Sequence, residues 1–483
     1  KELKLVAKEL IVQNQEKTEK IKNIFRILSC MKNDLGRDEI KKLVISIAIP
    51  SMIAQFVNVL YSIVDRMYIG HLPGIGALSL AGVGICGPVV TMIGAFASLI
   101  GVGGAPLASI AMGEKNNEKA KKIIGNAFLM MLFVSIVVVC AIYPFREKML
   151  YLFGASESTI PYALAYFEIY LLGTPFALFA VGMNNFINCQ GYAKIGMISV
   201  LIGAVTNIAL DPIFMYVLNL SVAGAAIATV ISQLVSAIFV LCVLKSHILT
   251  VRLELVKFDL QTCLHILKIG FTQFVIIAFD NVMIIAMNAI LQKYGGKEMG
   301  DILITANTIV QSFMLIVTMP LGGISGGTQC ILSYNYGAYL TDRVKEALRY
   351  ITLACISYCT FMFIVSWFCG KYFIYLFSTD ASVIKVATQA LHLMTLFIIP
   401  LGMQYAFVDG MTALGQVRIS LPLSFFRKAV YFVALFLLPY FYGAEMTFAA
   451  ESISDIVAPI VSFIVVKRSL NHILQWRLAM RED

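Results

Sequence analysis

The feature that most constrains this chain is a series of apolar segments, each long enough to cross a lipid bilayer. A helix rises about 1.5 Å per residue, so about 20 apolar residues span the roughly 30 Å hydrocarbon core. Such segments recur along most of the sequence, in which 59% of the residues are hydrophobic and 13% are charged. Because backbone polar groups inside lipid must be satisfied within the protein, the sequence predicts an all-α membrane protein with many spans.

The apolar segments divide the chain into two halves of six spans each. The predicted spans are 43–69, 77–110, 120–143, 158–188, 196–217, 221–244, 263–292, 301–334, 345–369, 382–412, 417–440 and 446–467. The longest charged connector, KSHILTVRLELVKFDLQTCLH, follows the sixth span. We therefore expect five regions: a cytoplasmic N-terminal segment (1–42), an N-lobe (43–245), a cytoplasmic linker (246–262), a C-lobe (263–468) and a cytoplasmic tail (469–483).

Basic residues are distributed unevenly over the predicted loops. With both termini in the cytoplasm, 28 of the 37 Lys and Arg residues fall on inner segments, 6 on outer segments and the rest within spans. An excess of Lys and Arg marks the cytoplasmic side. We expect a multi-pass protein of the plasma membrane with both termini cytoplasmic. The loops also account for the net charge of +9 without a nucleic-acid partner.

The two halves of the chain repeat one another. The Gly-rich segment GVGGAP…MGEKNNEKAK, which contains Gly113, is echoed by ISGGT…YGAYLTDRVK, which contains Gly337, at an offset of 224 residues. Six spans per half is an even number, so the copies share one orientation and are parallel repeats about an axis along the membrane normal. Two such six-helix bundles are expected to enclose a central cleft, a geometry that suits transport by alternating access.

Motifs for catalysis or nucleotide binding are missing from the sequence. The Gly-rich runs lack a preceding strand and a following Gly-Lys-Ser/Thr, and no HExxH, GxSxG elbow or carboxylate-rich metal cluster occurs. We expect a protein that is not an enzyme and has no nucleotide, cofactor or bound metal, so that an ion gradient drives transport. Met31 is a natural start before the first span, so residues 1–30 are either an upstream extension or a surface helix.

The fifth span carries two polar residues in an otherwise apolar segment. Asn207 and Asp211 are four residues apart, about one helical turn, so both point from one face. A carboxylate inside a span costs at least about 2.5 kcal/mol and is usually kept only where it faces a cavity or a partner. Either a neighbouring helix satisfies these groups as a packing contact, or they form a proton or cation site.

Two further polar residues are expected at a similar depth. Asp65 lies near the outer end of the first span and Thr229 in the outer half of the sixth. We expect both to converge with Asn207 and Asp211 on one ion-coupling pocket. Two carboxylates in a medium of low dielectric favour reversible protonation, and the oxygens of Asp65, Asn207 and Asp211 also suit Na⁺. The alternative for Asp65 is an interfacial residue that is paired locally or hydrated.

A proline interrupts the first span about one-third of the way along. Pro50 removes one helical hydrogen bond and crowds the preceding turn. Kinks in long helices usually occur at such residues. We therefore predict a hinge at Pro50 that lets the segment bearing Asp65 bend.

The C-terminal half carries its own polar groups and methionines. Asp280 lies at mid-depth and offers negative charge to a cationic substrate, while Met283 and Met287 offer adaptable apolar contacts. The alternatives are a hydrogen bond from a neighbour for Asp280 and ordinary core packing for the methionines. Arg427 and Asp455 lie near mid-depth on adjacent spans, and we expect them to form a structural ion pair.

The sequence resembles the multidrug and toxic compound extrusion (MATE) family, in particular its bacterial multidrug branch. The resemblance covers nearly all of residues 40–468 as an ordered set of motifs. These are IPSMIAQFVNVLYSIVDRMYIG (49–70), GVGGAPLASIAMGEKNNEKAKK (101–122), TNIALDPIFM (206–215), GAAIAT (224–229) and the echo GGISGGTQ…NYGAYLTDRVKEAL (322–348). No motif alone is specific, but their order across twelve spans is.

The resemblance implies two six-helix lobes in a V shape and multidrug efflux, with resistance to antibiotics, of organic cations in exchange for H⁺ or Na⁺. It also implies that the family's N-lobe ion site falls on Asp65, Asn207, Asp211 and Thr229. The implied partners are small organic cations and the lipid bilayer, and we expect a monomer. Branches of the family with a second-lobe site use acidic residues on the seventh and tenth helices, where this chain has Asp280 and Asp409.

A lipid-linked saccharide flippase of the same superfamily is the alternative transport function. Such a protein is expected to hold several basic residues in its cleft to bind pyrophosphate. The predicted spans contain only Arg66, Arg427 and Lys428. This small number of cations favours the antiporter.

Overall fold

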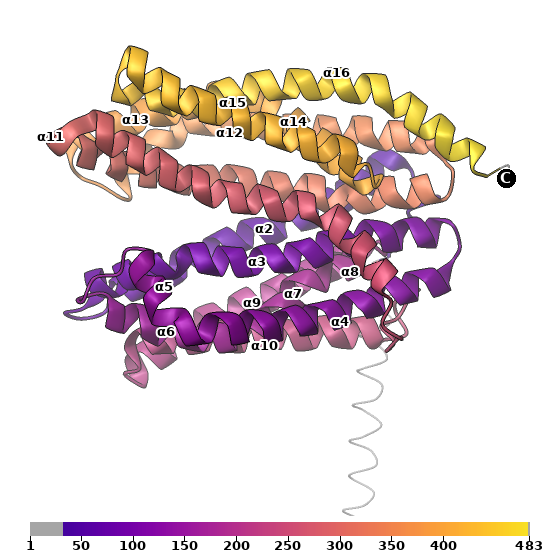
Figure 1. Ribbon diagram of the computed structural model, residues 1–483, viewed down its shortest axis with the longest axis horizontal. Helices are drawn as coiled ribbons and strands as arrows, with labels where there is room; N and C mark the ends of the chain where they lie inside the picture. The colour runs from indigo at the N-terminus through magenta and orange to yellow at the C-terminus, as the bar shows by residue number, and fades with distance from the viewer. Residues whose placement is uncertain (1–31, 482–483) are drawn as a thin grey trace, which may run out of the picture.

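The computed structural model describes residues 32–481, and the hypotheses about residues 1–30 lie outside this range. The described chain forms two groups of helices (Figure 1). The first, indigo to magenta, is the N-lobe: α2 (Ile40–Gly70), α3 (Gly76–Gly113), α4 (Asn117–Ile142), η1 (Tyr143–Phe145), α5 (Arg146–Leu152), α6 (Ile160–Leu172), α7 (Thr174–Gly182), α8 (Asn184–Asn188), α9 (Ala193–Pro212), the π-helical turn η2 (Ile213–Val217) and α10 (Ser221–Lys245).

The second group, pink to yellow in Figure 1, is the C-lobe. It consists of α11 (Leu260–Gly337), α12 (Thr341–Tyr375), α13 (Ala381–Thr395), α14 (Ile398–Ala413), α15 (Val417–Tyr442), η3 (Ala444–Phe448) and α16 (Ala449–Ala479). The helix α11 contains two spans, Leu260–Gly296 and Ile302–Gly337. They meet at Gly296, whose φ of 68° is accessible to glycine without the steric cost that a side chain adds.

The predicted all-α membrane architecture is confirmed. Within the described residues, ten helices are long and apolar enough to span a membrane, or twelve if two bent pairs each form one span. The bent pairs are α6 with α7, at 58°, and α13 with α14, at 48°, where the sequence predicted the single spans 158–188 and 382–412. Pro175 and Pro400 explain the bends, because each lies in the first turn of the second helix and lacks an amide hydrogen.

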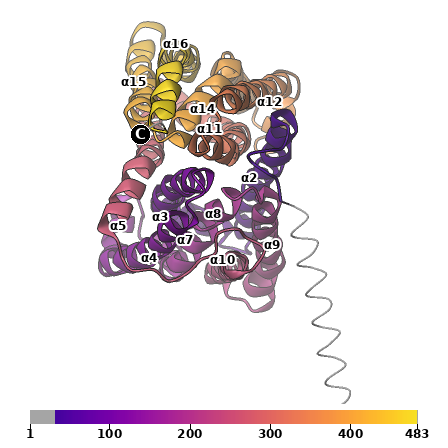
Figure 2. The same cartoon turned by 90° about the vertical axis from the view of Figure 1, so that its right-hand side faces the viewer.

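The lobes are related as parallel repeats. In the view of Figure 2, α2 reaches from the N-lobe towards α12, while the first span of α11 reaches from the C-lobe towards α4. Equivalent glycines pack at equivalent places: a Cβ on Gly103 would lie 2.3 Å from the carbonyl oxygen of Ile266, and one on Gly327 would lie 2.3 Å from Oγ of Ser51. Glycine therefore sets the closest approach of the first helix of each lobe to the other lobe.

The boundaries of the linker differ slightly from those predicted. It ends at Asp259, because this residue caps the amino terminus of α11 by accepting a hydrogen bond of 3.0 Å from the amide of Thr262. Asp259 also pairs with Lys122 at 2.9 Å. The hydrogen bond from the Thr262 hydroxyl, with the Lys122 contact, lowers the pKa of Asp259 to about 2. The linker is thereby fastened to α4 of the N-lobe.

The last helix continues into the segment predicted as a tail. Helix α16 runs without interruption to Ala479, and Arg477 in its last turn is 9% exposed. The guanidinium of Arg477 crosses to the N-lobe and donates to Glu114 at 2.6 Å. It also lies over the ring of Tyr339, 4.4 Å from the centroid. These contacts hold the two lobes together at the end predicted to face the cytoplasm.

Candidate functional site

The four residues predicted to form the ion-coupling pocket come from three helices that pack together. Asp65 lies on α2, Asn207 and Asp211 on α9, and Thr229 on α10. The helix α9 packs against both α2 and α10, which brings their polar side chains to one place. All four residues are buried, and Asp211 is fully so, at 0% exposed.

Asn207 is the centre of this group. Its Nδ2 atom donates to Oδ1 of Asp211 at 3.2 Å and lies 3.4 Å from Oγ1 of Thr229. The spacing of four residues on α9 therefore does place Asn207 and Asp211 side by side, as the helical period predicts.

Three oxygens of the group have no hydrogen-bond donor. Within residues 32–481, Oδ1 of Asp65, Oδ1 of Asn207 and Oδ2 of Asp211 are buried without a partner. A buried polar atom without a partner is costly, and a buried carboxylate without a cation costs more. Hard cations prefer carboxylate and carbonyl oxygens as ligands, and a carboxylate can also take up a proton. The arrangement is therefore suited to take up H⁺ or Na⁺.

The burial of Asp65 argues against the alternative interpretation, in which it is a hydrated residue at the membrane interface. Its side chain lies inside the N-lobe and is 8% exposed. The hydroxyl of Tyr216 in η2 donates to the carbonyl oxygen of Tyr68 at 2.7 Å, which ties the end of α9 to the turn of α2 that carries Asp65. The sequence reasoning missed Tyr216, because its effect comes from the π-helical turn that follows Pro212.

Pro50 lies within α2, which is a single helix from Ile40 to Gly70. The next residue, Ser51, is packed against Gly327 and Gly323 of α11. The proline is thus adjacent to the place where α2 meets the other lobe. The predicted hinge remains a prediction, and its position is one from which a bend would change the contact between lobes.

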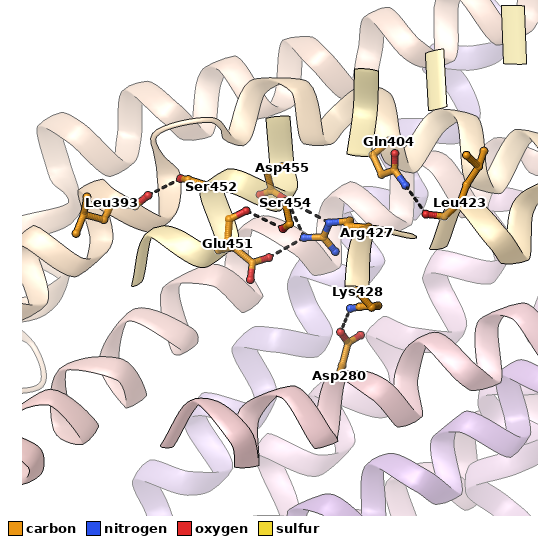
Figure 3. Close-up of polar contacts among 10 residues, drawn as sticks. All are labelled: Asp280, Leu393, Gln404, Leu423, Arg427, Lys428, Glu451, Ser452, Ser454 and Asp455. Carbon is orange, nitrogen blue, oxygen red and sulfur yellow. Dashed lines mark hydrogen bonds and ion pairs between the residues drawn. The ribbon is translucent and has the colours of Figure 1, made fainter. Parts of the chain in front are cut away.

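The three substrate-binding candidates of the C-lobe differ in exposure. Met283 and Met287 are 7% and 1% exposed and belong to the hydrophobic core. The side chain of Asp280 is 48% exposed and forms an ion pair with Lys428 of α15 (Figure 3). In this conformation Asp280 alone of the three presents its side chain at a surface.

The predicted ion pair between Arg427 and Asp455 is present. The guanidinium of Arg427 donates to Oδ1 of Asp455 at 2.8 Å and to Glu451 at 2.6 Å (Figure 3). Their side chains are at most 14% exposed. Sequence reasoning missed Glu451, which lies one helical turn before Asp455 on α16 and could have been found from that spacing.

Comparisons with known proteins agree with this architecture. The family model described as MatE matches residues 50–213 and 277–437. The multidrug export protein MepA of Staphylococcus haemolyticus (strain JCSC1435) is 25% identical over 427 residues, which cover 88% of this chain and 93% of that protein. The match to the family model extends over both lobes and includes Asp65, Asn207 and Asp211.

Two solved structures have the same fold. One is described as the outward-facing conformation of a multidrug resistance MATE family transporter of the MOP superfamily; the TM-score is 0.85 at 22% identity, over 91% of this chain and 98% of that one. The other, from Pyrococcus furiosus, is described as a MOP superfamily transporter whose reversed pocket polarity suggests a different function; the TM-score is 0.84 at 22% identity, over the same shares. At these identities, the likeness shows the fold alone.

Proposed function

This chain belongs to the multidrug and toxic compound extrusion (MATE) family of transporters, and from this premise we propose that it is a secondary antiporter. The proposed reaction exports small organic cations in exchange for H⁺ or Na⁺. The observation that carries the proposal is the buried group of Asp65, Asn207 and Asp211, with three oxygens that lack donors among the described residues. The relative from Staphylococcus haemolyticus, a multidrug export protein, supports the substrate class.

The proposed cycle uses the two carboxylates of the N-lobe. From the outside, H⁺ or Na⁺ binds between Asp65 and Asp211 and relieves the repulsion between their charges. Because Asp65 lies on α2, this neutralisation changes the balance of forces on the helix that contains Pro50. The α2 segment then bends at Pro50 and favours outward release of the drug. Loss of the ion to the cytoplasm restores the repulsion and resets the transporter, as alternating access requires.

The flippase alternative is disfavoured by the state of the cations inside the spans. Arg427 is neutralised by Glu451 and Asp455, and Lys428 is paired with Asp280. A site for a lipid-linked pyrophosphate needs basic groups that are free to bind phosphate oxygens. Of the three cations in the predicted spans, Arg66 is the one without an ion-pair partner among the described residues. A single free cation among the described spans is fewer than a pyrophosphate site is expected to need, so the chain suits an organic cation better.

Further parts of the proposal concern location and assembly. We place the transporter in the plasma membrane with both termini cytoplasmic, because basic residues are concentrated on those segments. We also propose that it acts as a monomer. No nucleotide or nucleic acid takes part in the cycle.

The proposal is tested with purified protein in liposomes that contain a fluorescent organic cation. A pH gradient and a Na⁺ gradient are imposed separately, and movement of the dye is followed in each case. Exchange driven by one of the gradients supports the antiporter and identifies its ion. If neither gradient moves any cation of a varied panel through folded protein, the proposal is wrong. Flipping of a fluorescent lipid-linked saccharide by the same preparation would then favour the alternative.

A further inference from the structure

The ion pair between Lys428 and Asp280 has a different character from the other charged contacts of the C-lobe. We propose that Lys428 is a tethered competitor of the substrate: its ammonium group occupies the carboxylate of Asp280 until an organic cation displaces it. The inference rests on the proposed export of organic cations. It assigns Asp280 as the substrate's anionic contact and Lys428 as the residue that sets how tightly a cation must bind.

The two partners are exposed to very different extents. The side chain of Lys428 is 7% exposed, whereas that of Asp280 is 48% exposed. A carboxylate that faced the acyl chains would be expensive and is expected to face water or a partner instead. The exposed side of Asp280 is therefore expected to face water, while the buried ammonium group of Lys428 reaches its carboxylate from α15 (Figure 3). A ligand dissolved in that water would reach the carboxylate of Asp280 without entering the packed core of the lobe.

Arg427, the residue before Lys428, is by contrast a permanently paired cation of this lobe. It is held by both Asp455 and Glu451, and all three side chains are at most 14% exposed. Among the described residues, Lys428 has Asp280 as its one ion-pair partner. Arg427 makes several directed hydrogen bonds, whereas a Lys ammonium acts as a point charge on a flexible stem. Of these two residues, Lys428 is therefore the one whose ammonium group a substrate cation can displace.

The surroundings of the pair suit an organic cation. Phe279 precedes Asp280 on α11, and Phe425 lies three residues, about one helical turn, before Lys428 on α15. Their rings pack edge to face, with centroids 5.2 Å apart. Phe425 is 39% exposed. Aromatic faces attract organic cations and cover their apolar parts. A monovalent cation with an apolar or aromatic body would replace the ammonium group and gain contacts that Lys428 does not make.

A cycle of variants tests the competition in proteoliposomes. Lys428→Gln removes the competitor and should lower the KM for a monovalent fluorescent cation about fivefold, the factor expected for losing a partly exposed ion pair. Lys428→Arg keeps the charge but can bind the carboxylate of Asp280 through two directed hydrogen bonds, so it should raise the KM above the native value. Asp280→Asn should raise the KM. In the Asp280→Asn background, Lys428→Gln should have no further effect, because there is no carboxylate left to release.

Several outcomes would overturn the inference. One is an unchanged or raised KM in folded Lys428→Gln, and another is the same fall in KM whether or not Asp280 is present. If Lys428→Gln does not fold, Lys428→Met, which has an unbranched apolar side chain, takes its place with the same expected result. Equilibrium binding of the dye to detergent-solubilised protein checks that KM reports affinity. If the native protein exchanges cations but the variants at Lys428 and Asp280 leave the KM unchanged, only this inference fails. If the native protein exchanges no cation, the proposed function itself fails.

Discussion

Gly113 and Gly337 occupy equivalent positions in the two repeats, and each packs against the backbone of the other's helix. A Cβ on Gly113 would lie 2.2 Å from the carbonyl oxygen of Tyr334, and one on Gly337 would lie 2.1 Å from that of Ile110. Ile110 and Tyr334 are themselves equivalent residues of the repeat. The contact is therefore symmetric about the axis that relates the lobes, and it closes the end predicted to be cytoplasmic.

This close approach predicts that even one methyl group will separate the lobes. Gly337→Ala should reduce the free energy of unfolding by about 1–3 kcal/mol, the usual cost of overpacking. A Cβ on Gly326, on the same span, would have no neighbouring atom within 4 Å. There Gly326→Ala should stabilise the helix by about 0.5–1 kcal/mol. Thermal unfolding in detergent compares the two variants, and shifts of the same sign and size would contradict the account.

The contact between Arg477 and Glu114 predicts a latch on the same end. Arg477→Gln should loosen it, because the hydrogen bond of 2.6 Å to Glu114 and the charge over Tyr339 are lost. Cys189 and Cys330 report the opening: both are free thiols that are at most 4% exposed, and Ser109 donates to the carbonyl oxygens of both.

The readout is the labelling of these two thiols by an impermeant maleimide, with mass spectrometry to assign the site. The rate at Cys189 and Cys330 should rise in Arg477→Gln when the reagent is added from the side predicted to be cytoplasmic. Cys242, an exposed thiol near the end of α10 that is predicted to be cytoplasmic, is the internal control whose rate should not change. Equal rates at Cys189 and Cys330 in variant and native protein would show that Arg477 does not hold the end closed.

The latch also has a defined dependence on pH. Partial burial raises the pKa of Glu114, but the hydrogen bonds from Arg477 and Lys119 outweigh it and leave the pKa below the ordinary value of 4.5. A lowered carboxyl pKa means that the stabilisation is complete above 4.5 and is lost as the pH falls through the lowered value. The difference in unfolding temperature between native protein and Arg477→Gln should be constant above 4.5 and shrink below it. A change in that difference around neutral pH would assign the contact to another group.

The charged cluster around Arg427 predicts a large effect on stability. Arg427→Met leaves Glu451 and Asp455 without their cation in a buried site, which should cost about 3–5 kcal/mol. Replacing Arg427, Glu451 and Asp455 together by apolar residues of similar size should recover most of the loss. Thermal unfolding measures both. A triple variant no more stable than Arg427→Met would mean that the cluster acts by something other than charge.

Much of this architecture follows from the spacing of apolar and polar residues. The four residues of the N-lobe site were predicted to converge, and Asn207 does bond Asp211 and reach Thr229. The helical period places Asn207 and Asp211 on one face of their helix. Asp65 and Thr229 were added to the group because they lie at a similar predicted depth in the membrane. Gly113 recurs as Gly337 at an offset of 224 residues, and this repeat similarly predicts two parallel lobes.

What the sequence did not yield depends on contacts between segments far apart in the chain. Nothing in the local pattern indicates that Arg477, in a predicted tail, reaches Glu114 some 363 residues away. Lys428 was counted as a cation within a span, but its choice of Asp280 depends on how α15 packs against α11. The bends between α6 and α7 and between α13 and α14 were also missed, although Pro175 and Pro400 mark them.

The measurement that tests the central claim most directly compares Asp211→Asn with the native protein in dye-loaded liposomes. Ser236→Ala, which removes a hydrogen bond of 2.9 Å to Ser199 in the same lobe, is the matched control. The account predicts that Asp211→Asn still exchanges dye for dye without a gradient but no longer accumulates it against a concentration difference when a pH or Na⁺ gradient is imposed. Ser236→Ala should do both. Undiminished gradient-driven transport by Asp211→Asn would show that the N-lobe site does not couple ion movement to export.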